Sequence, residues 1–359
     1  MEFLDILKCY FKNESYEIKD FNSLAKISKE QNLCPLVYYV TKDKRFKSQY
    51  INFAVAQEEM FNLQNELTNE LNKNNIKHIY FKGAVLARLY PDSALRTRGD
   101  IDIYVDYNDF SIAKDIMINL GYKEEVGQDC SHHVGLFKNG YEVELHFLLF
   151  DEGSLNLFTN YFKEPFRLSK NINNFEYKLD DTYHLIYCIC HFAHHLRFGA
   201  GIRYIIDFYY MLKKTNIDYQ LLHNELLKLD LSKLYNNILN VIYYLTNEKL
   251  DNIEIKDVNF FIDYMLKSGI HGFSEENNDG TIMESSRHKE KGHYFISRVF
   301  MTNKAYRISL YPKMGKHWYF YPICLIRHLF YLITHKMGAF FRFLFGKNAK
   351  KDIYDDIGI

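Results

Sequence analysis

The sequence has little proline, almost no tryptophan and no net charge. It contains five prolines and one tryptophan among 359 residues, and 45 Lys and Arg balance 45 Asp and Glu. Because there is no positive excess, no overall field draws the chain to long nucleic acid, and a polymerase acting on DNA or RNA is disfavoured. A local basic groove is still allowed. The scarcity of proline and tryptophan is a compositional habit and indicates nothing about function.

The cysteines do not suggest disulfide pairs, and we expect no secretory leader. The six cysteines are scattered, with no Cys-x-x-Cys motif. They indicate reduced thiols and therefore a cytoplasmic protein. The N-terminal apolar stretch carries acidic residues and lacks the layout of a signal peptide.

Long uninterrupted apolar runs are absent as well. Residues 318–345 are aromatic and apolar, but Arg327, Lys336 and Arg342 interrupt them, which argues against a transmembrane segment. We expect a helix buried in a helical C-terminal domain. A basic amphipathic helix in peripheral contact with a membrane is the alternative.

The pattern along the chain predicts an α+β protein. Its expected parts are an N-terminal helical segment (1–52), a core with a small mixed β-sheet and flanking helices (53–170), and a mainly helical C-terminal domain (171–359). Pro35 should break the N-terminal helices, and a polar gap interrupts the C-terminal ones at 268–291.

Apolar spacing predicts the elements of the core. They are a helix over 53–74, a strand over 76–81, one or two helical turns over 84–90, and a helix over 110–120 that Gly121 closes.

The most informative motif is Asp100-Ile101-Asp102, in an apolar run that ends at Val105. Side chains at i and i+2 of a strand share a face, about 6–7 Å apart at the backbone. The two carboxylates are therefore presented together, while Ile101 and Ile103 face the core. Such a pair suits two divalent cations about 3.5–4 Å apart, as used in phosphoryl and nucleotidyl transfer. Two solvated acids at a strand edge are the alternative.

A predicted β-hairpin supplies a third acid. Strand-like runs lie on both sides of Asn139-Gly140, a strong two-residue turn signal. The pairing that this turn sets is Gly135 opposite Glu144 and His133 opposite His146. One face of the hairpin is then apolar, and the other carries His133, Gly135, Glu142, Glu144 and His146.

In this order the motifs resemble the polymerase-β-type nucleotidyltransferase superfamily, in which a glycine turn, an Asp-x-Asp strand and a third carboxylate strand follow one another. More closely, residues 81–207 resemble a bacterial family of uncharacterised nucleotidyltransferases. The motifs that carry the likeness are Lys82-Gly83, Leu89-Tyr90-Pro91, Arg96-x-Arg98-Gly99-Asp100-Ile101-Asp102, His132-His133, Val143-Glu144-Leu145-His146, and His191 with His195.

The resemblance implies a nucleotidyltransferase core in which Asp100, Asp102 and Glu144 bind two Mg²⁺ ions, or Mn²⁺ in their place. Glu144 would bind the catalytic ion and activate the acceptor. The chain departs from the superfamily at Ala84, where the phosphate turn usually has a second Gly or Ser. The backbone or Lys82 would then make the triphosphate contact.

Further nucleotide-binding residues follow from the same likeness: Lys82, Gly83, Ala84, Arg98, Gly99, His133 and His146. The backbone after the strand at 76–81 would hold phosphate, and the basic side chains, together with Arg96, would neutralise it. For the two histidines, a simple cross-strand pair is the alternative to contacts with phosphate or acceptor. Glu142 is expected to be a solvated acid near the turn.

A helix beginning at Asp181 carries an imidazole face. Its residues are His184, Cys188, His191 and His195. We expect this face to pack against the sheet and wall the nucleotide site. Zinc chelation by His191 and His195 is a minor alternative, since a HEXXH motif is absent and no outside ligand is evident. Arg203 and Asp207 should form an intrahelical ion pair.

The resemblance thus implies Mg²⁺-dependent transfer of an NMP group from an NTP such as ATP to a small-molecule, sugar-type or protein acceptor. One alternative is a degenerate nucleotide-binding or partner-binding, antitoxin-like protein without turnover. Another is an enzyme that adds nucleotides to RNA 3′ ends. The base, the acceptor and the oligomeric state are left open.

Overall fold

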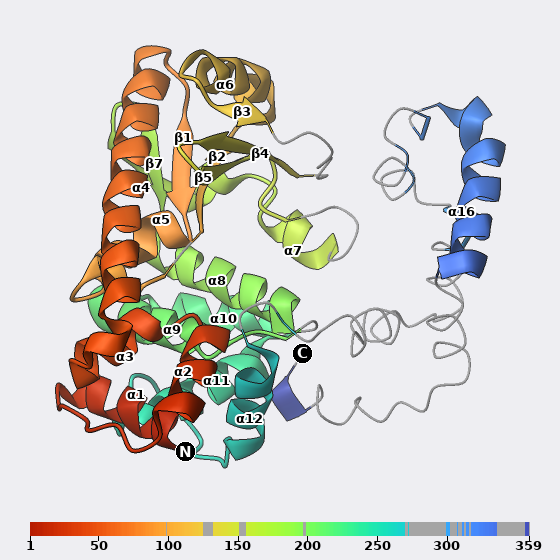
Figure 1. Ribbon diagram of the computed structural model, residues 1–359. Coiled ribbons are helices and arrows are strands. Elements are labelled where there is room, and N and C mark those ends of the chain that lie inside the picture. Colours follow the sequence, from red (N-terminus) through yellow and green to blue (C-terminus); the bar gives the residue numbers. More distant parts are fainter. Residues whose placement is uncertain are drawn as a thin grey trace.

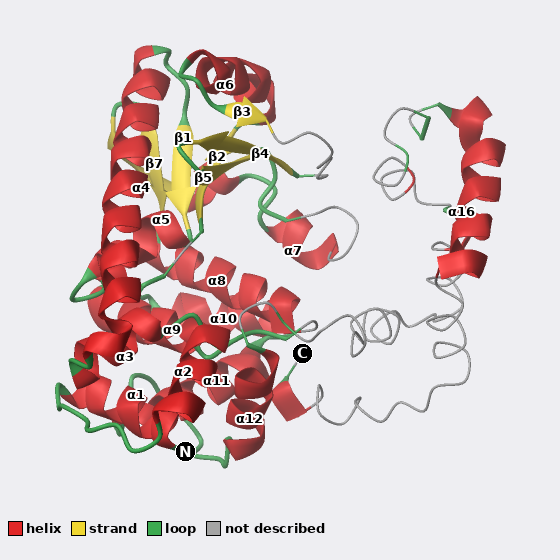
Figure 2. Ribbon diagram, viewed as in Figure 1, coloured by secondary structure: helices red, strands yellow, loops and turns green. Residues whose placement is uncertain are grey.

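The computed structural model describes most of the chain, and helices predominate in it (Figure 2). The described residues are 1–97, 99–124, 132–150, 156–196, 199–269, 272, 299–301, 307, 311, 314–315, 317–335 and 356–358.

A seven-stranded mixed β-sheet organises one end of the molecule (Figure 1). Its strand order is β3-β4-β5-β2-β1-β7-β6. β2 pairs in parallel with β5 and antiparallel with β1. The mixed sheet with flanking helices confirms the predicted α+β class. The strands are β1 (His78–Phe81), β2 (Asp100–Val105), β3 (Lys123–Glu124), β4 (His133–Lys138), β5 (Tyr141–His146), β6 (Ser169–Asn173) and β7 (Glu176–Leu179).

The predicted hairpin is formed by β4 and β5. Asn139 (φ +55°) and Gly140 (φ +83°) both have left-handed backbone conformations, as a tight hairpin turn requires. The register places Gly135 opposite Glu144, which confirms the pairing predicted from the turn.

The hairpin of β6 and β7 was not predicted. Both strands are short and largely polar, and alternation is confined to the four residues of β7, which is too short a run to predict a strand. β7 pairs in parallel with β1, and the sheet therefore continues to Leu179.

Two helices cover the apolar face of the sheet: α4 (Lys47–Lys73) and α6 (Tyr107–Asn119). Leu67 of α4 and Met117 of α6 are fully buried in one cluster with Ile101, Ile103 and Leu145. This packing confirms that the isoleucines of the Asp-x-Asp strand face the core. Both predicted helices exist, but each begins earlier than expected.

The opposite side of the sheet faces the helical part of the protein (Figure 1). A second, larger apolar cluster fills that part. Its helices are α1 (Glu2–Lys12), α2 (Phe21–Glu30), α3 (Cys34–Thr41), α8 (Asp181–Leu196), α9 (Arg203–Lys214), α10 (Tyr219–Lys228), α11 (Ser232–Thr246) and α12 (Asn259–Ser268). Pro35 was expected to interrupt helices, but it lies in the first turn of α3, where its missing N–H costs nothing.

Short elements connect these layers. The helical turns predicted after Gly83 are α5 (Gly83–Leu86) and the 3₁₀ turn η2 (Ala87–Leu89). The others are η1 (Lys44–Phe46), η3 (Ser93–Leu95), α7 (Asn156–Tyr161), η4 (Pro165–Leu168) and η6 (Trp318–Phe320).

The last long helix described is α16 (Tyr321–His335). Ile326 and Phe330 on it are each 69% exposed, so the expectation of a helix buried in the helical domain is wrong for this stretch. Among the described helices, none is long and apolar enough to span a membrane. Most of the predicted polar gap at 268–291 lies outside the described residues.

A buried ion pair connects the segment before β2 to the helical part. The Arg96 guanidinium donates two hydrogen bonds to the Asp207 carboxylate in α9, each 3.0 Å long, and the Tyr90 hydroxyl donates a third at 2.7 Å. Asp207 was expected to pair with Arg203, but Arg203 donates instead to the backbone oxygen of Thr97. That expectation was wrong because Arg96, 111 residues away in the sequence and expected to neutralise phosphate, reaches Asp207 through the tertiary fold.

Replacing Asp207 with Ala should lower the free energy of unfolding by about 3–5 kcal/mol. The reason is that the buried Arg96 guanidinium loses its counter-charge. Urea titration followed by circular dichroism measures the change. Glu254→Ala, in the exposed Lys256–Glu254 pair, is the control and should cost less than about 1 kcal/mol. Similar costs for the two variants would contradict this role of the buried pair.

Candidate functional site

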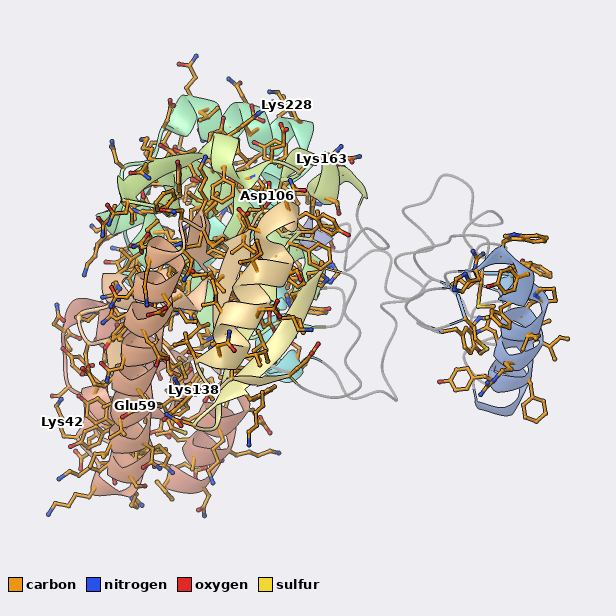
Figure 3. All side chains as sticks on the ribbon, turned by 90° about the horizontal axis from the view of Figure 1, so that it is seen from above. Lys42, Glu59, Asp106, Lys138, Lys163 and Lys228 are labelled. Carbon is orange, nitrogen blue, oxygen red and sulfur yellow. The ribbon has the colours of Figure 1, made fainter. Side chains whose placement is uncertain are left out.

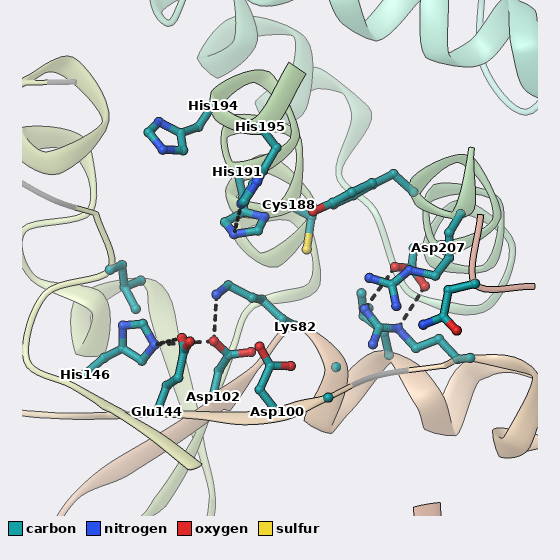
Figure 4. A pocket seen from close by; sticks show the side chains of 18 of the residues that line it. Lys82, Asp100, Asp102, Glu144, His146, Cys188, His191, His194, His195 and Asp207 are labelled. Atoms are coloured by element: carbon teal, nitrogen blue, oxygen red, sulfur yellow. Dashed lines mark hydrogen bonds and ion pairs between the residues drawn. The ribbon is translucent and has the colours of Figure 1, made fainter. Parts of the chain in front are cut away.

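Three acidic side chains lie together at one end of the sheet. Asp100 and Asp102 project from β2, and the parallel register places Asp102 beside Glu144 of β5 (Figure 4). Asp102 is fully buried. Burial, and then the charge of Asp102, raises the pKa of Asp100 above its usual value. The fold has therefore concentrated negative charge where water screens it poorly.

Lys82 compensates part of this charge. Its Nζ lies 2.6 Å from Asp102 Oδ1. Burial disfavours the charged amine, but the Asp102 charge outweighs it, with Glu144 and Asp100 adding to the effect, and the Lys82 pKa rises well above its ordinary value. Lys82 is thus a fixed positive charge beside the acids.

The backbone of Lys82 is strained. Its φ of +49° and ψ of −126° fall in a region that normally needs glycine. Lys82 directly follows β1 and precedes α5, so the chain makes its sharp turn at this residue. The turn brings the ammonium group to Asp102.

His146, at the end of β5, contacts two of the acids. Its Nε2 lies 3.1 Å from Glu144 Oε2 and 3.3 Å from Asp102 Oδ1. Burial opposes protonation of this ring, but the hydrogen bonds to Asp102 and Glu144 prevail and raise the His146 pKa. Burial would raise the Glu144 pKa, yet the bond to His146 and the Lys82 charge lower it.

Two more imidazoles lie next to His146. His132 Nε2 is 3.0 Å from His133 Nδ1, and His133 Nε2 is 3.8 Å from Glu144 Oε1. Burial and the neighbouring His146 lower the pKa of His132 to about 2 and that of His133 to about 4. Both rings are therefore neutral near pH 7.

Helix α8 forms the opposite wall. His191 and His195 point their Nε2 atoms at each other, 3.0 Å apart (Figure 4). Burial, and then nearby charged groups, lower the pKa of His195 to about 3. One turn before His191, Cys188 also faces the cavity, and His184 Nε2 accepts a hydrogen bond from the Lys82 backbone N–H at 3.2 Å. The imidazole face of this helix does pack toward the sheet end, as predicted.

These groups enclose a cavity of about 760 Å³. Residues from α4, the β1–α5 turn, β2, the β4–β5 hairpin, α8 and α9 line it. Cavities of this size accommodate small-molecule ligands.

Only some of the other predicted site residues line the cavity. Gly83 and Gly99 line the cavity, and a Cβ at Gly99 would meet no atom within 4 Å. Ala84 is fully buried in the core behind the sheet. Arg98 lies outside the described residues. Arg96 lines the cavity, but its charge is already neutralised by Asp207.

Several residues that line the cavity were not predicted from the sequence. His132 was noted only as part of a motif, and His194, Lys29 and Phe53 were not considered. The paired histidines at 132–133 were a usable signal, whereas Lys29 and Phe53 reach the cavity only through tertiary packing. Gly135 lies opposite Glu144 as predicted, and a Cβ there would lie 2.9 Å from Glu142 Oε1, so the glycine makes room for that carboxylate.

The donor set fits a divalent cation. Asp102, Glu144 and His146 each offer one ligand atom within 4.8 Å of the others. Asp102 Oδ2 is buried without a hydrogen-bond partner. A buried carboxylate oxygen rarely remains unsatisfied, and a cation bound there would satisfy it.

One comparison with known proteins gives a match. The model of a family described as "Uncharacterised nucleotidyltransferase" matches residues 18–247, which is well over half of the chain and includes every cavity-lining residue. No curated protein and no solved structure matches. The family match confirms the predicted resemblance to the uncharacterised nucleotidyltransferases, whereas the resemblance to the polymerase-β-type superfamily stays a prediction.

Lys82→Gly should be more stable than Lys82→Ala by about 1–3 kcal/mol, because both remove the amine but only glycine relaxes the strained φ. The measurement is urea unfolding of the two variants. Lys77 has no positive φ and provides the matched control. There, Gly should be less stable than Ala. The same order at both positions would contradict strain at Lys82.

His184 should make folding sensitive to acid. Burial lowers its pKa from 6.5 to about 4. Between these values the unfolded chain binds a proton that the native protein does not. The free energy of unfolding therefore decreases as the pH is lowered, by up to about 1.4 kcal/mol per pH unit for this group. In urea titrations from pH 6.5 to 4.5, His184→Gln should show a shallower decline than the wild type. Equal slopes would contradict the shift.

Proposed function

This chain belongs to the uncharacterised nucleotidyltransferase family, and from that membership we propose that it transfers an NMP group from an NTP to a small acceptor with the help of divalent cations. Asp100, Asp102 and Glu144 would hold the cations, and pyrophosphate would leave. Family membership supports nucleotidyl transfer in general, and the site supports the finer statement.

The observation that carries the proposal is the convergence of the three carboxylates. They lie on two adjacent parallel strands of the only sheet among the described residues. One oxygen of the Asp102 carboxylate is buried and has no hydrogen-bond partner. Lys82 and His146 offset part of the repulsion among these charges, and bound cations would offset the rest. Bound divalent cations would align the attacking and leaving oxygens and neutralise developing charge.

The remaining groups have roles in binding and proton transfer. Lys82 presents an ammonium group that can contact the triphosphate once cations take over the charge of Asp102. This assigns to Lys82 the contact that the buried Ala84 side chain does not make. Glu144 and the neutral His133 ring can accept the proton of an acceptor hydroxyl.

The acceptor is a small molecule or a single side chain. The cavity of about 760 Å³ holds a nucleotide and a small partner but no duplex. The balanced charge of the chain also disfavours long nucleic acid. A protein without turnover and an RNA-directed enzyme are the alternatives that the following experiment separates.

Asp102→Asn should reduce label transfer by about 10³-fold, because it removes a shared cation ligand worth several kcal/mol of transition-state stabilisation. The assay incubates each α-labelled NTP with Mg²⁺ or Mn²⁺ and a fractionated cell extract and identifies the labelled product. Glu59→Gln, an equivalent change on the surface of α4 (Figure 3), is the control and should retain full transfer.

No transfer by the wild type with any NTP would contradict enzymatic turnover. Label appearing only in RNA would contradict the small acceptor. Circular dichroism of Asp102→Asn verifies that the loss is not one of folding.

A further inference from the structure

The ring of His146 is held in one orientation. Its Nδ1 lies 3.3 Å from the backbone oxygen of Leu148. A carbonyl oxygen only accepts, so Nδ1 carries a proton and donates it. In the neutral ring, Nε2 then presents a lone pair. Metal-bound histidines are commonly fixed in this way, by donating their other N–H to a backbone carbonyl.

That lone pair points toward two carboxylates. His146 Nε2 lies 3.1 Å from Glu144 Oε2 and 3.3 Å from Asp102 Oδ1. Three electron-pair donors at such distances need a positive charge among them. Without a metal, that charge is a proton on Nε2, together with the Lys82 ammonium group on Asp102. A bound cation would replace the proton and join the same three atoms. Ligands about 2.1 Å from a small octahedral cation are about 3 Å apart along each edge. The spacing of these donors matches that of neighbouring metal ligands.

The nitrogen ligand bears on the choice of ion. Mg²⁺ is bound almost entirely by oxygen, whereas imidazole suits first-row transition ions. Resting on the metal-dependent function proposed above, we infer that the cation between Asp102 and Glu144 is also ligated by His146 Nε2. The centre therefore prefers a first-row transition ion such as Mn²⁺ to Mg²⁺.

Other imidazoles of the cavity are weaker candidates. His132, His133 and His146 also lie within 4.8 Å of one another, but this set brings no negative charge. Two of its nitrogens are already 3.0 Å apart in a mutual contact, as are those of His191 and His195. Only the set with Asp102 and Glu144 combines a nitrogen ligand with anionic oxygens.

The test is pulsed electron paramagnetic resonance of the full-length protein with Mn²⁺. The wild type should show coupling of Mn²⁺ to ¹⁴N, which changes to the ¹⁵N pattern when the protein is labelled with ¹⁵N-histidine. This readout needs no substitution and no turnover. Mg²⁺ competition against the Mn²⁺ signal should show that Mn²⁺ binds about tenfold or more tightly.

Two matched variants locate the nitrogen. His146→Gln should abolish the nitrogen coupling and reduce the preference for Mn²⁺ by about tenfold or more. His191→Gln, in the same cavity but on α8, should retain both. Coupling that disappears with His191→Gln instead would place the ion on α8 and overturn the inference.

The results also separate this inference from the proposed function. Binding of Mn²⁺ and Mg²⁺ with equal affinity and without nitrogen coupling overturns the role of His146 only. A wild-type protein that binds neither ion overturns the metal-dependent function as well.

Discussion

The parallel pairing of β2 with β5 determines the chemistry of this protein. It brings Asp102 beside Glu144, and Asp100 follows on the same face of β2. Negative charges so close together in a buried place repel strongly. The surroundings offset that repulsion: Lys82 adopts a strained backbone and donates to Asp102, and His146 lies between two of the acids. The same charge density supports the cation site proposed above.

The two faces of the sheet keep these charges in place, because one packs against helices and the other faces the cavity. The apolar side of β2 and β5 packs against α4 and α6, so the strands cannot shift register without exposing isoleucine and leucine. The polar side faces α8 across the cavity. The buried Arg96–Asp207 pair, joined by Tyr90, fixes α9 to the segment that leads into β2. The cavity thus lies between two packed units that are held at a defined distance.

Local patterns explain what could be predicted from the sequence. Alternation along β2 and the Asn139-Gly140 turn define faces and register within a few residues, so the pairing of Gly135 with Glu144 was predictable. The partner of Asp207 was not, because Arg96 approaches it only through the tertiary fold. The strain at Lys82 and the hairpin of β6 and β7 leave no periodic signal. The acids were therefore predictable as a group, but the residues that compensate their charge were predicted only in part.

Under the proposed function, the charge in the cavity would couple nucleotide binding to cation binding. Among the described residues, the cationic groups in contact with the acids of the site are Lys82 and His146, since Arg96 is neutralised by Asp207. The histidines whose pKa is lowered by burial stay neutral and add no positive charge. A triphosphate entering this cavity without cations would meet net repulsion in a poorly screened space. Under the proposed function, cation binding would therefore raise nucleotide affinity, and by reciprocity the nucleotide would raise cation affinity. Lysines in place of these histidines would bind the triphosphate without a cation. Neutral imidazoles add no such charge, so nucleotide binding would still depend on bound cations.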